Sequence, residues 1–145
     1  MTGKWPASKA APIIAALVAL VGLTDAVYLT IHHYTAEPVP CSIVEGCEMV
    51  LTSDYAAIGG VPIAALGALA YAAAFGLAVL TVLGKTSFWK LYGAHTALMA
   101  AITVYLIYLQ AFVIGAFCQF CLLSAAVTFT LFLIFILSAV FRRRS

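Results

Sequence analysis

The sequence predicts an all-α integral membrane protein, built as a bundle of four transmembrane helices. Hydrophobic residues make up 66% of its 145 residues, charged residues make up only 8%, and the mean hydropathy is +1.15. This apolar share is far above that of soluble domains. Four apolar runs are each long enough to cross a bilayer, which takes about 20 helical residues: 11–34, 61–83, 91–112 and 118–141. Because little sequence lies outside these runs, we expect residues 1–145 to form a single membrane domain.

The basic residues predict how the helices are oriented. All seven lie before the first run, between the second and third runs, or after the fourth: Lys4, Lys9, Lys85, Lys90, Arg142, Arg143 and Arg144. The connections at 35–60 and 113–117 contain neither Lys nor Arg. Cytoplasmic loops of membrane proteins carry the excess of Lys and Arg. We therefore expect a multi-pass protein of the cell (inner) membrane, with both termini in the cytoplasm and these two connections on the outer, periplasmic side.

The first outer connection, residues 35–60, is long for a compact domain, and such loops are usually functional or disordered. It contains enough apolar residues to favour order, and 48–57 is compatible with a short amphipathic helix over the mouth of the bundle. After the Gly59-Gly60 turn, Pro62 falls in the first turn of the second helix, where its missing N–H costs little. We expect this connection to act as a lid.

Four cysteines fall on the predicted outer side, Cys41 and Cys47 in the loop and Cys118 and Cys121 at the start of the last helix. Residues three apart share one face of a helix, and a helix N-terminus favours the thiolate. Disulfides persist on the outer, oxidising side of the membrane. Two close pairs there favour redox-active disulfides. Two other interpretations stay open: buried cysteines acting as small apolar residues, and a four-cysteine zinc site, although we expect no metal.

Two polar residues within the spans are candidates for a binding site. Asp25 is the only acidic residue in a predicted span. Intramembrane ionisable residues usually face the bundle interior and often mark a site, but Asp25 could also be a structural group bonded to a neighbouring helix. Tyr108, near the outer end of the third span, fits an interfacial aromatic belt and could also contact a bound ring.

The faces of the second and fourth spans carry further patterns. Beyond Cys121, the same face continues inward with Ser124 or Ala125 and then Thr128, which predicts a mostly apolar pocket suited to a lipid-soluble ring compound. In the second span, small residues recur at a spacing of four, which predicts close helix packing along this stripe: Gly60, Ala64, Ala68, Ala72 and Gly76.

Together these features resemble the prokaryotic homologues of vitamin K epoxide reductase. The resemblance covers nearly the whole chain and rests on the four spans, the two loop cysteines, Ser53-x-Tyr55, Gly60-Val61-Pro62 and Phe117-Cys118-x-x-Cys121. The short spacing of the loop cysteines is similar to that of the bacterial branch. Many bacterial members carry a fused thioredoxin-like domain; since this sequence stops at Ser145, a separate partner is expected.

The resemblance implies a function and a role for each cysteine. Electrons would pass from a thioredoxin-fold, DsbA-like protein on the outer side to a membrane quinone of the ubiquinone, menaquinone or phylloquinone type, supporting disulfide formation in exported proteins. Cys47 would exchange with the partner, Cys41 would reduce Cys118, and Cys121 would reduce the quinone. Three residues of helix rise would place Cys121 about 4.5 Å deeper than Cys118.

The resemblance also assigns the loop hydroxyl of Ser53 to the quinone site. With Cys121, Tyr108 and Asp25, it completes the expected quinone-binding residues. Besides lipid, quinone and the thioredoxin-fold protein, we expect no nucleic-acid partner.

Two alternative functions remain. One is a quinone or vitamin K epoxide reductase whose product is the reduced ring. However, Ala125 occupies the position of the tyrosine that animal members place four residues after the last cysteine. The other is a non-catalytic membrane protein with structural disulfides or zinc.

Overall fold

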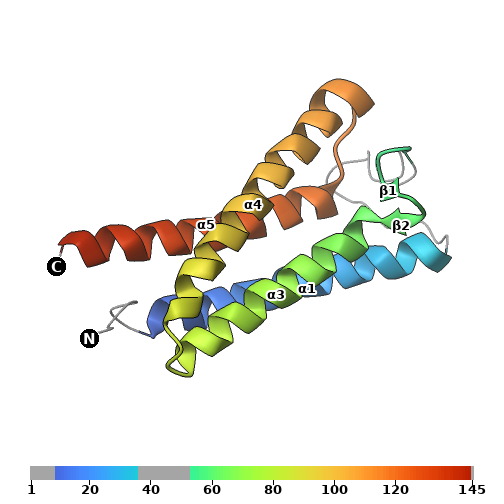
Figure 1. Cartoon of the computed structure of the whole chain (residues 1–145). Coiled ribbons are helices and arrows are strands. Elements are labelled where there is room, and N and C mark those ends of the chain that lie inside the picture. Colours follow the sequence, from blue (N-terminus) through green and yellow to red (C-terminus); the bar gives the residue numbers. More distant parts are fainter. Residues whose placement is uncertain (1–8, 36–52, 145) are drawn as a thin grey trace.

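The computed structural model describes residues 9–35 and 53–144, and these form a bundle of long helices (Figure 1). Four helices are long and apolar enough to cross a membrane, which confirms the predicted all-α fold. They are α1 (Ala10–Thr35), α3 (Ile63–Val82), α4 (Ser87–Tyr108) and α5 (Gln119–Arg144). The largest difference from the predicted limits is in α4, which begins at Ser87 rather than at Leu91. Cys41 and Cys47 lie outside the described residues.

A π-helical segment, η1 (Leu109–Ile114), continues α4 and leads to the start of α5. It ends at Gly115, whose φ of 77° lies in the left-handed region that residues with a Cβ rarely adopt. The backbone N–H groups of Gly115 and Ala116 both donate to the carbonyl oxygen of Gln110, at 3.0 and 3.1 Å. This turn lets α5 run back antiparallel to α4.

Ahead of α3, the chain forms a small hairpin of β1 (Ala57–Ile58) and β2 (Val61–Pro62), with Ala57 opposite Pro62. Gly59 and Gly60 between them both have positive φ, as a type I′ hairpin turn requires. The expected amphipathic helix at 48–57 is therefore wrong for its described part, 53–57, which is a turn entering this hairpin. Pro62 also precedes α3 instead of lying in its first turn.

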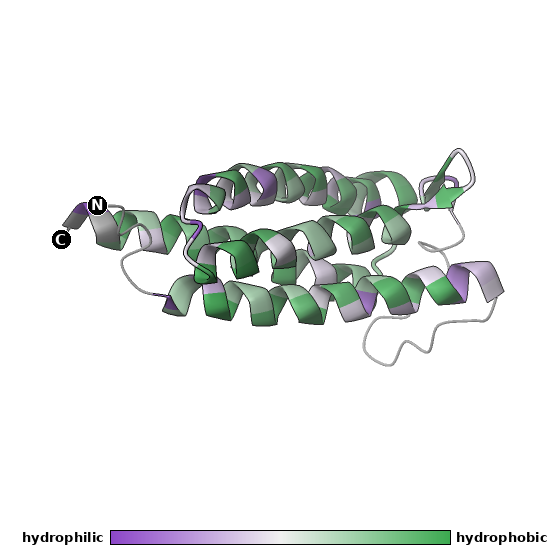
Figure 2. Cartoon of the chain, turned by 60° about the horizontal axis from the view of Figure 1, so that its bottom comes forward, coloured by the Kyte–Doolittle hydropathy of each residue, from purple (hydrophilic) through white to green (hydrophobic). Residues whose placement is uncertain are grey.

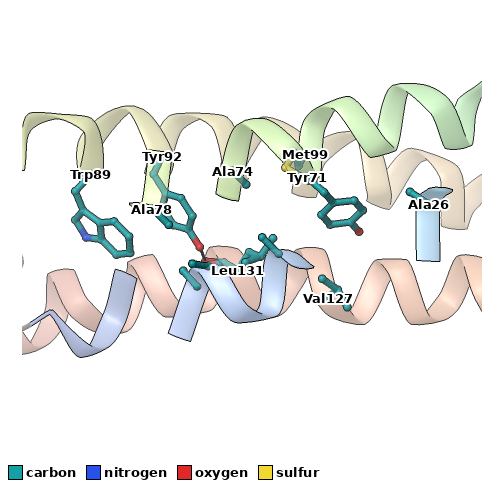
Figure 3. Close-up of a cluster of buried hydrophobic side chains, with 12 residues drawn as sticks. Ala26, Tyr71, Ala74, Ala78, Trp89, Tyr92, Met99, Val127 and Leu131 are labelled. Atoms are coloured by element: carbon teal, nitrogen blue, oxygen red, sulfur yellow. Dashed lines mark hydrogen bonds between the residues drawn. The ribbon is translucent and has the colours of Figure 1, made fainter. Parts of the chain in front are cut away.

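Small residues allow α1 and α3 to pack side by side (Figure 1). The stripe predicted from the spacing of four is wrong at both ends: Gly60 lies exposed in the hairpin turn before α3, Ala72 is exposed, and a Cβ at Gly76 would meet nothing within 4 Å. The neighbouring face of α3 is buried instead: Tyr71, Ala74 and Ala78. It packs in one cluster with the small residues of α1 (Figure 3): Ala15, Ala16, Ala19 and Ala26.

Aromatic side chains hold the other end of the bundle together. The rings of Trp89 and Tyr92 are stacked at 4.4 Å between centroids. Trp89 Nε1 donates to Ser138 Oγ at 3.1 Å. The Tyr92 hydroxyl donates to the Leu131 carbonyl at 2.8 Å (Figure 3). Figure 2 shows that hydrophobic residues predominate along the helices. Many of their large apolar side chains are exposed, as expected for surfaces in contact with lipid.

Candidate active site

A cavity of about 420 Å³ lies at the end of the bundle where α5 begins. Its walls come from α1, α3, α4, η1 and α5, and residues of the 53–58 segment complete them. The volume falls in the range of small-molecule sites, roughly 300–1,000 Å³. Apolar side chains dominate the lining, so that a ring compound would meet few polar groups there.

Three of the predicted quinone-site residues line this cavity together. They come from separate parts of the chain: Asp25 from α1, Ser53 from the segment before the hairpin, and Cys121 from α5. Tyr108 does not line it. That side chain is half exposed and packs on Phe112, with 5.4 Å between ring centroids.

Tyr105, three residues before Tyr108, lines the cavity instead. The two tyrosines lie on adjacent faces of α4, and the sequence could not show which face turns inward. The expected inward continuation beyond Cys121 agrees with the structure, since Ser124, Ala125 and Thr128 all contribute to the lining.

Cys118 and Cys121 are both thiols, and they contact each other at the first turn of α5. Cys118 is fully buried and lies just before the spanning part of α5, which starts at Gln119. Its carbonyl oxygen accepts the first helical hydrogen bond of this turn, from the Leu122 N–H at 2.9 Å. Cys121 reaches the cavity, whereas Cys118 does not line it.

The geometry of this turn makes the Cys118 thiol more acidic than an ordinary cysteine. A hydrogen bond from the Cys121 thiol lowers the pKa of Cys118 to about 7, from a usual value of 9.0, despite the opposing effect of burial. The backbone N–H groups of Cys121 and Phe120 act in the same direction. These donors are the unpaired N–H groups of a helix N-terminus, which stabilise a thiolate.

Gln110 is a residue of this site to which the sequence assigned no role. Its side chain is buried, and its Oε1 accepts the backbone N–H of Cys118 at 3.0 Å. Since its carbonyl also accepts the N–H groups of Gly115 and Ala116, one residue fixes the whole connection into α5. The available signal was a glutamine within a mostly apolar span.

Tyr71 is a second such residue. Figure 3 shows it pointing from α3 toward α5. Its hydroxyl donates to the Ser124 carbonyl at 2.8 Å and lies 2.6 Å from Ser124 Oγ and 2.8 Å from Thr128 Oγ1. With its proton directed to the carbonyl, the phenol oxygen can accept from both hydroxyls. A lone tyrosine in an alanine-rich span was the only signal in the sequence.

Comparison with known proteins identifies the family. The model of the vitamin K epoxide reductase family matches residues 13–136. This chain belongs to that family. The matched range includes all four cysteines and every residue that lines the cavity.

One protein similar in sequence to this chain is the thiol-disulfide oxidoreductase LTO1 of Arabidopsis thaliana. It is 33% identical over 119 residues, which are 76% of this chain and 32% of the relative. The chain thus spans about a third of the length of that curated relative.

The acidity of Cys118 predicts a pH dependence of its reactivity. Below about pH 7 its thiol is protonated, and above it the thiolate dominates. In a Cys41→Ser/Cys47→Ser background, the alkylation rate of reduced Cys118 should therefore rise with a midpoint near pH 7. Peptide mass spectrometry after treatment with a small membrane-permeant alkylating agent measures this rate.

The matched variant is Cys121→Ala, which removes the largest cause of the lowered pKa. Its midpoint should move up toward that of an ordinary thiol. An identical midpoint in both proteins would show that Cys121 does not stabilise the Cys118 thiolate.

Proposed function

We propose that this protein is a membrane thiol–disulfide oxidoreductase that transfers electrons to a quinone and supports disulfide formation in exported proteins. The observation that carries this proposal is the position of Cys121: it is a free thiol, hydrogen-bonded to a second thiol, and it faces an apolar cavity large enough for a ring compound. A pair of structural cysteines would not need access to such a cavity.

The electrons balance for this pair. When Cys118 and Cys121 form a disulfide, they release two electrons, with two protons if both start as thiols and one proton if Cys118 starts as a thiolate. A quinone takes up two electrons and two protons to give a hydroquinone. Cys121, at the cavity wall, is the cysteine that meets the ring, and Cys118 behind it supplies the second sulfur of the disulfide.

The cavity suits a quinone with a hydrophobic tail. Several lining residues are exposed apolar side chains on facing parts of α3 and α4, among them Leu66, Ile102 and Tyr105. The cavity therefore reaches the lipid-facing surface between these helices, and a tail could extend there. The Ser53 hydroxyl is our candidate hydrogen-bond donor to a ring carbonyl. Ubiquinone, menaquinone and phylloquinone all meet these requirements.

The loop cysteines would complete the relay. We propose that Cys47 exchanges with the dithiol of a thioredoxin-fold, DsbA-like protein and that Cys41 then reduces the Cys118–Cys121 disulfide. This order comes from the family resemblance, which favours the prokaryotic branch. Its physical support is that Cys118 is separated from the cavity. Because Cys118 does not meet the ring, it can exchange with the loop cysteine.

The cavity end of the bundle is proposed to face the outer side of the cell membrane. The start of α1, the turn between α3 and α4, and the end of α5 lie together at the opposite end (Figure 1). The basic residues described there are Lys9, Lys85, Lys90 and Arg143. Under the positive-inside rule, this end is cytoplasmic.

A labelling experiment checks this orientation. In intact cells, a thiol reagent that cannot cross membranes should modify reduced Cys41 and Cys47 from the outside. The control is Ser87→Cys in a Cys41→Ser/Cys47→Ser background, which should react only after permeabilisation. Labelling of the loop cysteines solely from the cytoplasmic side would refute both the orientation and the proposed partner.

The function itself can be tested on purified protein. Reduced protein mixed with a short-chain quinone should form one hydroquinone for each Cys118–Cys121 disulfide, measured by absorbance and by thiol trapping. Thiols that survive quinone treatment, together with bound zinc in a metal analysis, would favour the non-catalytic alternative.

A second assay addresses the epoxide alternative. Ala125 lines the cavity at the position where, by the family resemblance, animal members place the tyrosine that holds vitamin K. We therefore expect little turnover when an epoxide of vitamin K replaces the quinone.

A further inference from the structure

Asp25 is the one described side chain whose buried polar atom has no partner. The residue is only 7% exposed, and its Oδ2 forms no hydrogen bond within the described part of the chain. None of the described basic residues forms an ion pair with it. A buried polar group left unpaired costs about 1–3 kcal/mol, so such a group calls for an explanation.

The position of Asp25 suggests what its partner is. The side chain lines the cavity together with Cys121, and it is close enough to Tyr71, Cys118 and Cys121 to affect them electrostatically. The Tyr71 hydroxyl is already engaged with Ser124 and Thr128 and offers Asp25 no bond. The free oxygen is thus available to a molecule in the cavity.

The proton balance of the reaction creates a need for such a group. The pKa of Cys118 is lowered to about 7, so part of the population starts as a thiolate–thiol pair, which carries two electrons but only one proton. Even as a thiol, Cys118 does not line the cavity, so its proton is not placed to reach the ring. The hydroquinone needs two protons. A second proton must therefore enter the cavity from a group other than the cysteines.

We propose that Asp25 is a catalytic residue that binds a quinone carbonyl as a neutral carboxylic acid and donates the second proton as the ring is reduced. This inference rests on the proposed function. A charged carboxylate would be strongly disfavoured in these apolar surroundings, whereas the neutral acid is tolerated and can donate a hydrogen bond. After the hydroquinone leaves, Asp25 takes up a proton and the site is restored.

Two substitutions separate proton donation from simple hydrogen bonding. Asn can donate a hydrogen bond but not a proton, so Asp25→Asn should lower kcat for quinone reduction about 100-fold, within the range of general acid catalysis, while the KM for the quinone changes little. Asp25→Glu should recover much of kcat. The matched control is Asp54→Asn, an exposed acid beside Ser53 that does not line the cavity; it should retain wild-type kinetics.

A second measurement does not depend on the folding of any one variant. Infrared difference spectra of the reduced wild-type protein, recorded on addition of quinone, should show loss of a neutral carboxyl C=O band, and Asp25→Glu should shift that band. Exchange of Cys118–Cys121 with a small dithiol, without quinone, should be equal in all variants.

The outcomes distinguish the two proposals. Wild-type protein that does not reduce quinone would overturn the proposed function. Wild-type protein that reduces quinone, combined with an unchanged kcat in Asp25→Asn or an unchanged carboxyl band, would overturn the role of Asp25 alone. An effect of Asp25→Asn on KM only would also overturn it, leaving Asp25 as a binding group.

Discussion

Replacing Cys121 with serine is expected to abolish quinone reduction completely. Cys121 is the described cysteine that lines the cavity, and serine cannot form the disulfide that releases the electrons. The loop pair does not depend on this sulfur, so Cys41 and Cys47 should still exchange with a thioredoxin-fold partner. Stopped-flow absorbance of the quinone and thiol trapping of the partner measure the two steps separately.

Cys47→Ala should produce the opposite defect. Oxidation of the partner protein should stop, because the cysteine proposed to receive its electrons is missing. A small membrane-permeant dithiol should still drive quinone reduction, since it can reduce Cys118–Cys121 without the loop. If both variants fail in the same way with both reductants, the proposed order of the relay is wrong.

The parts of this protein that follow from local composition could be predicted from sequence. Hydrophobic length determines where a helix can cross a membrane, so the four spans were found. Helical periodicity then put Ser124, Ala125 and Thr128 on the face below Cys121. These inferences need only one helix at a time.

The missed features depend on how helices meet. The role of Gln110 follows from the π-helical segment and the turn at Gly115, which bring residue 110 against residue 118. The stripe predicted for α3 failed because an alanine-rich helix offers several small faces, and only the fit of Tyr71 against α1 selects one. Tyr108 was preferred over Tyr105 because the sequence does not show which face of α4 turns toward the other helices.

Replacing Gly22 with alanine should damage both stability and the cavity. Gly22 is buried in α1, and a Cβ there would overlap the Tyr71 ring. The ring cannot easily withdraw, because its hydroxyl is held by Ser124 and Thr128. Overpacking of this kind costs about 1–3 kcal/mol, and thermal unfolding in detergent should show a lower midpoint.

Two other glycines serve as matched controls. Gly76→Ala should be tolerated, since a Cβ there meets nothing within 4 Å. Gly93→Ala would overlap the Phe135 ring at the far end of the bundle, so it should destabilise the protein while leaving the KM for the quinone nearly unchanged. Gly22→Ala should raise that KM as well, because Tyr71 forms part of the cavity wall. Equal stability and equal KM for Gly22→Ala and Gly76→Ala would mean that Tyr71 does not pack against α1 as described.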